Sequence, residues 1–155
     1  MPEGGKMAQI LIVDDEVDML ALLAMIITDK SIHKATTTNN PLEVPKLIQN
    51  GAFDLLITDL KMPGMDGTEL IAEVRKTDKA IPILIITAYG SVESAEDAIV
   101  KGAYDYITKP FRKEQILIAI SRALEWKDMK KKLDSFEGDT LEGNKSEEDK
   151  SKEDT

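Results

Sequence analysis

The chain has 155 residues, of which 42% are hydrophobic and 32% are charged, and its formal net charge is −9. This size favours one compact domain, and no uninterrupted apolar run approaches the roughly 18 residues that span a bilayer. Because there is no cysteine, disulfide frameworks, thiolate zinc sites and cysteine nucleophiles are excluded. The first six residues contain no apolar stretch with a cleavage site, so no secretory signal is visible and we expect a cytoplasmic protein.

Most of the negative charge lies at the end of the chain. Residues 134–155 contain 9 acidic and 3 basic side chains, whereas the rest of the chain is close to neutral. Residues 138–155 have only one large apolar side chain, which is too little burial to offset the entropy of ordering, so we predict an acidic disordered tail. A near-neutral domain lacks the long-range attraction to a phosphate backbone, so we expect no direct nucleic-acid binding by this chain.

Short apolar runs alternate with segments of helical periodicity. In chain order, the expected strands are residues 10–13, 33–37, 55–57, 83–86 and 104–107, and each is followed by an expected helix. Continuous apolar runs are typical of parallel strands that helices cover on both faces. The pattern predicts an α/β domain over residues 7–128, with a doubly wound five-stranded parallel sheet. Residues 1–6 form an N-terminal extension, and residues 129–137 form a helical extension or linker.

Two glycines lie where helices of this pattern should end. Gly51 and Gly102 follow the second and fourth expected helices. A residue with a left-handed backbone commonly follows the last turn of a helix, and glycine adopts it at no steric cost. We therefore predict a left-handed conformation at both positions.

Polar side chains follow four of the expected strands at the point where each strand ends. Asp14 and Asp15 follow the first strand, Asp59 the third, Thr87 the fourth and Lys109 the fifth. An aspartate after a strand often only caps the next helix, and a single lysine is usually solvated. Four strands that each deliver a charged or hydroxyl group to the same edge are hard to explain by capping alone. In a doubly wound sheet this edge is where ligands bind.

Three carboxylates at one edge need a counter-charge. Two like charges about 4 Å apart repel by roughly 4 kcal/mol at an effective dielectric near 20. A set of oxygen ligands without histidine or cysteine indicates a hard cation such as Mg²⁺, which keeps waters and accepts a phosphoryl oxygen. Thr87 and Lys109 then offer a hydroxyl and a cation to the same phosphoryl group. The sequence thus points to phosphoryl chemistry.

These residues resemble the receiver domain of two-component response regulators. The resemblance rests on Asp14-Asp15, on the run Ile57-Thr58-Asp59-Leu60-Lys61-Met62-Pro63-Gly64-Met65-Asp66-Gly67, on Thr87-Ala88 and on Lys109-Pro110-Phe111. It implies a flavodoxin-like (βα)5 fold. Further runs resemble receivers of the nitrogen-regulation type of transcriptional activator, namely Gly90-Ser91, Gly102-Ala103-Tyr104-Asp105-Tyr106 and Ala123-Leu124-Glu125.

The resemblance also implies a mechanism. Asp59 is the phosphoacceptor, and its donor is a sensor histidine kinase or a phosphotransfer protein. Asp14 and Asp15 hold Mg²⁺ together with Asp59 and the backbone carbonyl of Lys61, while Thr87 and Lys109 bind the phosphoryl oxygens. Thr87 then moves toward the phosphoryl group and leaves space for Tyr106, which switches a protein-interaction surface. Such a chain modifies itself and is not an enzyme with a separate substrate.

Two other functions are open alternatives. One is a stand-alone receiver in a phosphorelay, as opposed to a part of a transcription regulator whose effector domain is absent here. The other is an aspartyl-phosphate phosphatase of the haloacid dehalogenase type, although such enzymes carry a second aspartate two residues after the nucleophile. Lys61 occupies that position.

The last expected helix continues past the domain. Trp126, Met129, Leu133 and Phe136 recur at spacings of three, four and three, as in the seam of a coiled coil. This pattern favours a homodimeric connector, and the alternative is a helix end that folds back on its own domain. The seam spans less than two heptads, so it would be weak alone.

Overall fold

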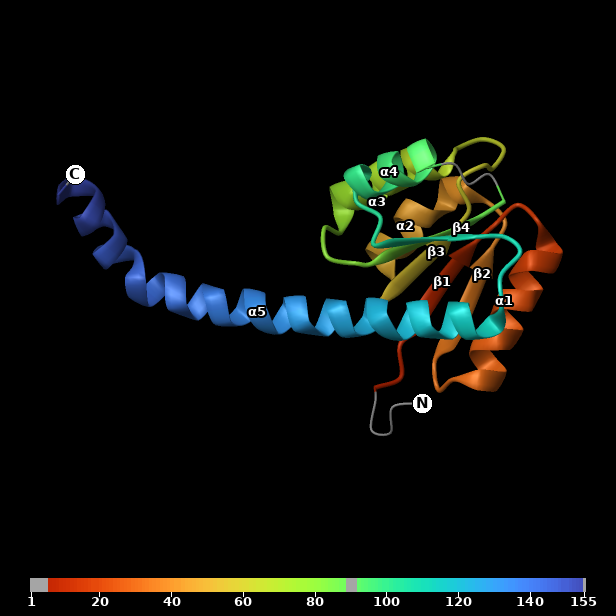
Figure 1. Ribbon diagram of the computed structural model, residues 1–155, viewed down its shortest axis with the longest axis horizontal. Helices are drawn as coiled ribbons and strands as arrows, with labels where there is room; N and C mark the ends of the chain where they lie inside the picture. The colour runs from red at the N-terminus through yellow and green to blue at the C-terminus, as the bar shows by residue number, and fades with distance from the viewer. Residues whose placement is uncertain (1–5, 89–91, 155) are drawn as a thin grey trace.

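The computed structural model describes residues 6–88 and 92–154, except the side chains of Val92, Ser94 and residues 134–154. Its centre is one parallel sheet of five strands, in the spatial order β2-β1-β3-β4-β5 (Figure 1). The strands are β1 (Gln9–Val13), β2 (Lys34–Thr38), β3 (Leu55–Thr58), β4 (Ile83–Thr87) and β5 (Asp105–Thr108). The predicted doubly wound sheet is therefore confirmed. Residues 1–5 of the expected N-terminal extension lie outside the described residues.

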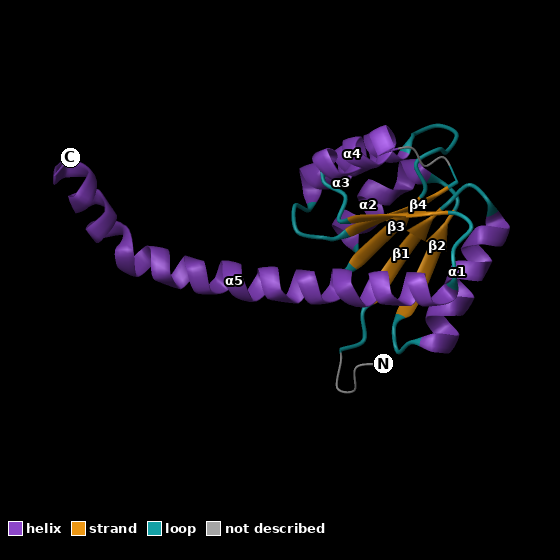
Figure 2. Cartoon of the chain, viewed as in Figure 1, coloured by secondary structure: helices purple, strands orange, loops and turns teal. Residues whose placement is uncertain are grey.

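Helices cover both faces of this sheet (Figure 2). One face is covered by α1 (Val17–Lys30) and α5 (Lys113–Asp154). The other is covered by the 3₁₀ turn η1 (Pro41–Glu43), α2 (Val44–Asn50), α3 (Gly67–Thr77) and α4 (Val92–Lys101). The helix expected to start near Pro41 is thus divided into a 3₁₀ turn and an α-helix. Asn40 precedes the turn, and its side chain accepts a hydrogen bond from the Leu42 backbone N–H.

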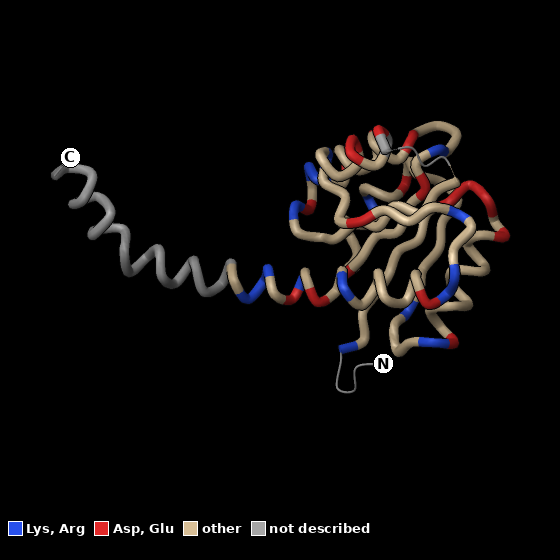
Figure 3. Tube along the Cα trace, in the orientation of Figure 1, with Lys and Arg blue, Asp and Glu red and all other residues tan. Residues whose placement is uncertain are grey.

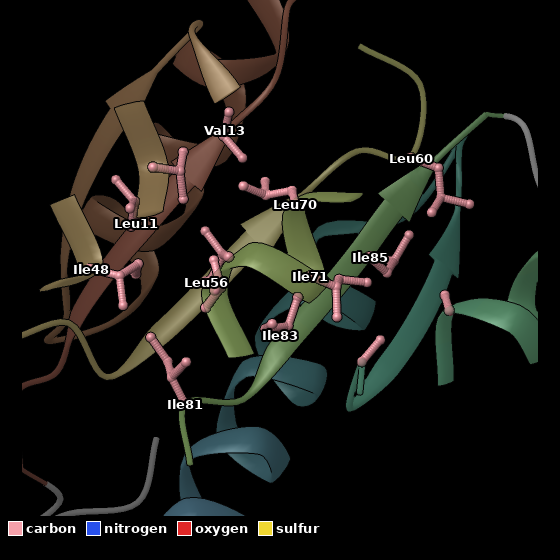
Figure 4. Close-up of a cluster of buried hydrophobic side chains, with 14 of the residues drawn as sticks. Leu11, Val13, Ile48, Leu56, Leu60, Leu70, Ile71, Ile81, Ile83 and Ile85 are labelled. Atoms are coloured by element: carbon pink, nitrogen blue, oxygen red, sulfur yellow. The ribbon is translucent and has the colours of Figure 1, made fainter. Parts of the chain in front are cut away.

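The hydrophobic core consists of two layers, one on each side of the sheet. Figure 4 shows the layer beneath α2, α3 and α4, where Leu56 and Ile83 of two strands lie near Ile71 of α3, and Leu11 of β1 lies near Ile48 of α2. On the other side, neighbouring residues of the same strands, such as Ile10, pack against α1 and α5. Both faces of the inner strands are buried, which explains why their sequences are continuously apolar. Each fully buried leucine or isoleucine stabilises the fold by about 1.5–3 kcal/mol.

The two glycines at helix ends differ from each other. Gly102 has a φ of +120°, as predicted. The prediction for Gly51 is wrong, because its backbone is extended, with φ −103° and ψ 165°. The requirement for glycine there is steric, since a Cβ atom would lie 2.7 Å from Cε2 of Phe53 and 2.9 Å from the carbonyl oxygen of Leu47. A close approach of this kind leaves no local signal in the sequence.

Helix α5 leads away from the domain (Figure 1) and continues to Asp154. It is longer than the predicted extension over residues 129–137, and it runs into the segment predicted to be disordered. Glutamate and lysine in that segment favour a helix, whereas Gly138 and Gly143 oppose it. Because an unpacked helix is only marginally stable in water, disorder of residues 138–155 stays a prediction.

Acidic and basic residues are both spread over the chain. Figure 3 shows acidic residues in the loop that leads from β1 into α1, and residues of both charges along the part of α5 that it colours.

In the part of the chain that the structure describes, no helix combines the length and hydropathy that crossing a membrane requires.

Candidate functional site

The polar residues predicted at strand ends meet at the carboxyl edge of the sheet. Asp14 follows β1, Asp59 follows β3 and Thr87 ends β4, and all three are buried, with exposed fractions of 2%, 3% and 0%. Asp15 follows Asp14 and is exposed. The parallel register carries successive strand ends to the same edge, so the shared location follows from the topology.

Lys109, which follows β5, connects two of the carboxylates. Its Nζ donates hydrogen bonds to Oδ2 of Asp59 at 2.9 Å and to Oδ2 of Asp14 at 3.1 Å. The same Nζ lies 3.7 Å from Oε1 of Glu16. The lysine side chain is only 10% exposed, so water screens these contacts weakly. A buried cation between two buried anions fixes all three side chains, because removing one partner would leave an unpaired buried charge.

The second carboxylate oxygen of Asp59 is held by its own loop. Oδ1 accepts hydrogen bonds from the backbone N–H groups of Leu60 at 2.6 Å and Lys61 at 3.2 Å. Helix α3 begins directly against this loop, where the Gly67 N–H donates to the Leu60 carbonyl at 2.7 Å. Asp66 caps the helix, with Oδ1 accepting from the Glu69 N–H. The orientation of Asp59 is therefore set by the loop and by the start of α3.

Four carboxylates form a cluster that could hold a metal ion. Asp14, Asp15, Glu16 and Asp59 each offer one oxygen, and these oxygens all lie within 4.8 Å of one another. Beside them lies an open pocket of about 340 Å³, lined by Asp15, Glu16, Asp59, Lys61, Met62, Pro63 and Asp66. An all-oxygen ligand set beside an open pocket suits Mg²⁺, which keeps several waters and binds phosphate oxygens. The cluster is thus compatible with Mg²⁺.

The protonation equilibria reflect burial and pairing. Burial raises the pKa of Asp14 above its ordinary value, although hydrogen bonds from the Glu16 N–H and from Lys109 oppose this. Burial alone would lower the pKa of Lys109, but its bonds to Asp59 and Asp14 outweigh burial and raise it. The lysine is therefore held as a cation, whereas the buried Asp14 carries a cost for its charge. A further cation at the cluster would reduce that cost.

Thr87 and Tyr106 lie on the two strands next to this cluster. The Thr87 carbonyl accepts a hydrogen bond from the Lys109 N–H at 2.9 Å. Tyr106 pairs with Ile85 in the register of β4 and β5, so Tyr106 and Thr87 belong to the same face of the sheet. The Tyr106 hydroxyl is buried, and among the described residues it has no hydrogen-bond partner. Burial raises the pKa of Tyr106, as does the nearby Asp59.

Glu16 was not predicted from the sequence. It directly follows Asp14-Asp15 and immediately precedes α1. Its carbonyl accepts hydrogen bonds from the N–H groups of Met19 and Leu20, so its backbone caps the helix. Its carboxylate nevertheless belongs to the cluster. The run of three acidic residues was the only sequence signal for this role.

The sequence of the chain matches a known protein family. Residues 10–121 match the family model described as the response regulator receiver domain. The chain belongs to this family. The family predicted from the four motifs is therefore confirmed.

Relatives of the receiver domain include transcriptional regulators. This chain is 33% identical over 120 residues to the transcriptional regulatory protein ZraR of Klebsiella oxytoca, and 36% identical over 120 residues to the transcriptional regulatory protein GlrR of Escherichia coli K12. Each match covers 77% of this chain and 27% of the relative. The chain thus spans about a quarter of the length of these relatives.

Solved structures show the same fold. The crystal structure of NtrX from Brucella abortus in complex with ADP is 34% identical with a TM-score of 0.79, and the match covers 84% of this chain and 30% of that one. A CheY-like receiver domain from Methanospirillum hungatei is 28% identical with a TM-score of 0.76, covering 81% of this chain and 99% of that one. The similarity to NtrX agrees with the predicted nitrogen-regulation type. A receiver is a signalling domain.

Proposed function

We propose that Asp59 accepts a phosphoryl group from a phosphohistidine of a sensor histidine kinase or a phosphotransfer protein. A carboxylate oxygen of Asp59 forms the new bond to phosphorus as the bond between phosphorus and the histidine nitrogen breaks, and the nitrogen keeps the electron pair. The observation that carries this proposal is the contact of Lys109 with both Asp59 and Asp14 beside an open pocket. Lys109 can move from these carboxylates to the phosphoryl oxygens, so a cation is in place where negative charge accumulates.

The proposed metal ligands are Asp14, Asp15, Asp59 and the backbone carbonyl of Lys61. When bound, Mg²⁺ would neutralise the phosphoryl oxygens and orient them for in-line transfer. Lys61 lines the pocket next to Asp15 and Asp59, which supports its inclusion. Glu16 adds a fourth carboxylate at the mouth of the pocket.

Loss of the Asp15 carboxylate should weaken Mg²⁺ binding. For Asp15→Asn we expect an affinity about tenfold lower, since the variant removes a ligand charge and keeps the side-chain shape. For Glu16→Gln we expect an Mg²⁺ affinity about threefold lower, because the exposed charge of Glu16 is screened by solvent. Isothermal calorimetry with Mg²⁺ alone measures both. Asp29→Asn is the matched control, because Asp29 is an exposed acid at the far end of α1. Equal affinities in Asp15→Asn and the wild type would contradict the metal site.

Thr87 and Tyr106 form the proposed switch. The Thr87 hydroxyl turns toward the phosphoryl group, and the Tyr106 ring takes the space beside it. Among the described residues the buried Tyr106 hydroxyl has no partner, which is costly, so an arrangement in which it gains one can compete with the present position. Phosphorylation then needs only a few kcal/mol of differential binding to exchange the two states.

A receiver and a phosphatase differ in turnover. With acetyl phosphate and Mg²⁺, we expect the chain to accumulate up to one phosphoryl group, measured by intact mass. A phosphatase would release many phosphates per chain while carrying little label. Lys61 stands where a phosphatase of this type needs an aspartate, which favours the receiver.

The output of the switch has two candidates. Relatives such as ZraR are transcriptional regulators of which this chain matches 27%, which favours regulation of transcription through an effector domain. The alternative is a stand-alone receiver that signals by protein contact in a phosphorelay. Both require a cytoplasmic domain that meets its kinase.

We further propose that α5 pairs with a second copy of the chain. The α5 stripe, formed by Trp126, Met129 and Leu133, borders an open groove of about 690 Å³. Met129 is 69% exposed and Leu133 is 54% exposed, and the helix leads away from the domain instead of folding back (Figure 1). Large apolar side chains at coiled-coil spacing on a projecting helix favour a partner helix.

The dimer should be weak and depend on the α5 stripe. We expect sedimentation equilibrium to show self-association at high micromolar concentration, which increases with a phosphoryl mimic and Mg²⁺. Leu133→Gln should abolish it, whereas Lys131→Gln, on an exposed neighbouring position, should not. A wild type that stays monomeric in both states would reject the dimer and favour the single-partner receiver.

A further inference from the structure

Helix α5 is held at the amino-terminal end of the sheet by an aromatic contact. The rings of Tyr104 and Trp126 lie with their centroids 5.4 Å apart and are inclined by 48°. The Tyr104 hydroxyl donates a long hydrogen bond of 3.4 Å to the Arg122 carbonyl in the preceding turn of α5. Lys130 adds a cation–π contact, with its Nζ 4.9 Å from the centre of the Trp126 ring. These contacts form the aromatic anchor.

An ionic contact at the next residue holds α5 to a different part of the sheet. Lys127 Nζ lies 2.8 Å from Oδ1 of Asp54, the residue before β3. Oδ2 of Asp54 accepts a hydrogen bond of 2.8 Å from the N–H of Gln9, the first residue of β1. This ionic anchor therefore connects α5 to two inner strands.

The aromatic anchor belongs to an edge strand. Strand β5 pairs only with β4, so it can shift without breaking a second ladder. Tyr104 directly precedes β5, and Lys109 of the site directly follows it. Between them lies Tyr106, with its buried hydroxyl that lacks a partner among the described residues. One strand of four residues thus carries the site lysine at one end and the aromatic anchor at the other.

The two anchors respond differently to a movement of β5. A shift of β5 would carry Tyr104 with it, whereas β1 and β3 lie inside the sheet and would keep Asp54 in place. The Tyr104 ring would then move relative to Trp126 while Lys127 kept its position. Trp126 is the first residue of the α5 stripe. The change in its contact with Tyr104 would therefore arise where the projecting part of α5 begins.

We infer that the Tyr104–Trp126 contact is the joint through which the state of the phosphorylation site reaches the projecting part of α5. This inference rests on the proposed function of Asp59. Tyr104 and Trp126 act here as positioning residues and do not touch the reacting atoms. The joint sets the orientation in which the α5 stripe is presented to its partner.

The sole tryptophan of the chain makes the joint measurable. Trp126 lies at the end of the sheet opposite the carboxylates, so neither Mg²⁺ nor a phosphoryl mimic quenches it directly. We expect beryllofluoride with Mg²⁺ to shift its emission by several nanometres and to change its acrylamide quenching constant, at a concentration where the chain is monomeric. Mg²⁺ alone should do neither.

Three variants separate the joint from general packing. Tyr104→Leu keeps apolar volume but removes the ring contact, so the response of Trp126 to beryllofluoride should be lost. Asp54→Asn is the control that weakens the ionic anchor, and it should keep the response. Thr87→Ala should also lose the response, because the switch is broken.

The outcomes distinguish the joint from the proposed function. If the wild type accepts label from acetyl phosphate yet Trp126 does not respond to beryllofluoride, the joint is refuted and the function stands. A normal response in Tyr104→Leu would also refute the joint. If the wild type accepts no label, the proposed function fails, and the joint fails with it.

Discussion

Replacing Asp59 with asparagine should reduce labelling by acetyl phosphate, or by a cognate kinase, to below detection. The amide cannot act as the nucleophile that the carboxylate provides. It also removes one of the two anions that hold Lys109, whose Nζ lies 2.9 Å from Oδ2 of Asp59 and 3.1 Å from Oδ2 of Asp14. The lysine side chain is then held less firmly. Intact mass after incubation with acetyl phosphate and Mg²⁺ measures the outcome.

The matched control for this prediction lies in the same pocket. Asp66 lines the pocket with Asp59, but its Oδ1 serves to cap α3. Asparagine caps helices about as well as aspartate, so Asp66→Asn makes the same chemical change without removing a cap. We expect this variant to keep its label. Labelling of Asp59→Asn at the level of Asp66→Asn would mean that another residue is the acceptor.

The fold could be predicted from the sequence because the inner strands are buried on both faces. Ile10 and Leu11 pack into opposite layers of the core, so apolar residues run continuously along β1. The carboxyl ends of parallel strands then coincide by topology. Asp14, Asp59 and Lys109 are far apart in the chain, yet the sequence alone could place them together for this reason.

Features that depend on close approach in three dimensions could not be predicted. The requirement for glycine at position 51 is one, since the Phe53 ring and the Leu47 carbonyl oxygen exclude a side chain there. The Tyr104–Trp126 contact is another, because Tyr104 precedes β5 instead of belonging to it and so leaves the alternation of the strand. Local periodicity reports which face of an element is buried, but not which side chain lies against it.

Gly67 also depends on a close approach that the sequence does not reveal. Its substitution should have a large effect on the site. A Cβ atom at Gly67 would lie 2.5 Å from the Asp59 carbonyl oxygen and 2.8 Å from the Leu60 Cα atom. Both neighbours are backbone, so the loop that orients Asp59 must move. Overpacking of this kind costs about 1–3 kcal/mol of stability, and a displacement of about 1 Å at a reacting group can slow transfer by roughly 100-fold.

Gly67→Ala should therefore fold with reduced stability and accept label far more slowly than the wild type, with the rates measured by intact mass at several times. Gly51→Ala is the matched control. Its Cβ atom would also contact a neighbour, at 2.7 Å, but next to Phe53 at the opposite end of the sheet. We expect Gly51→Ala to lower the urea midpoint while labelling at the rate of the wild type. If the two variants lost labelling in proportion to stability, general destabilisation would explain both. A slow rate in Gly67→Ala alone would assign its effect to the displaced backbone of Asp59.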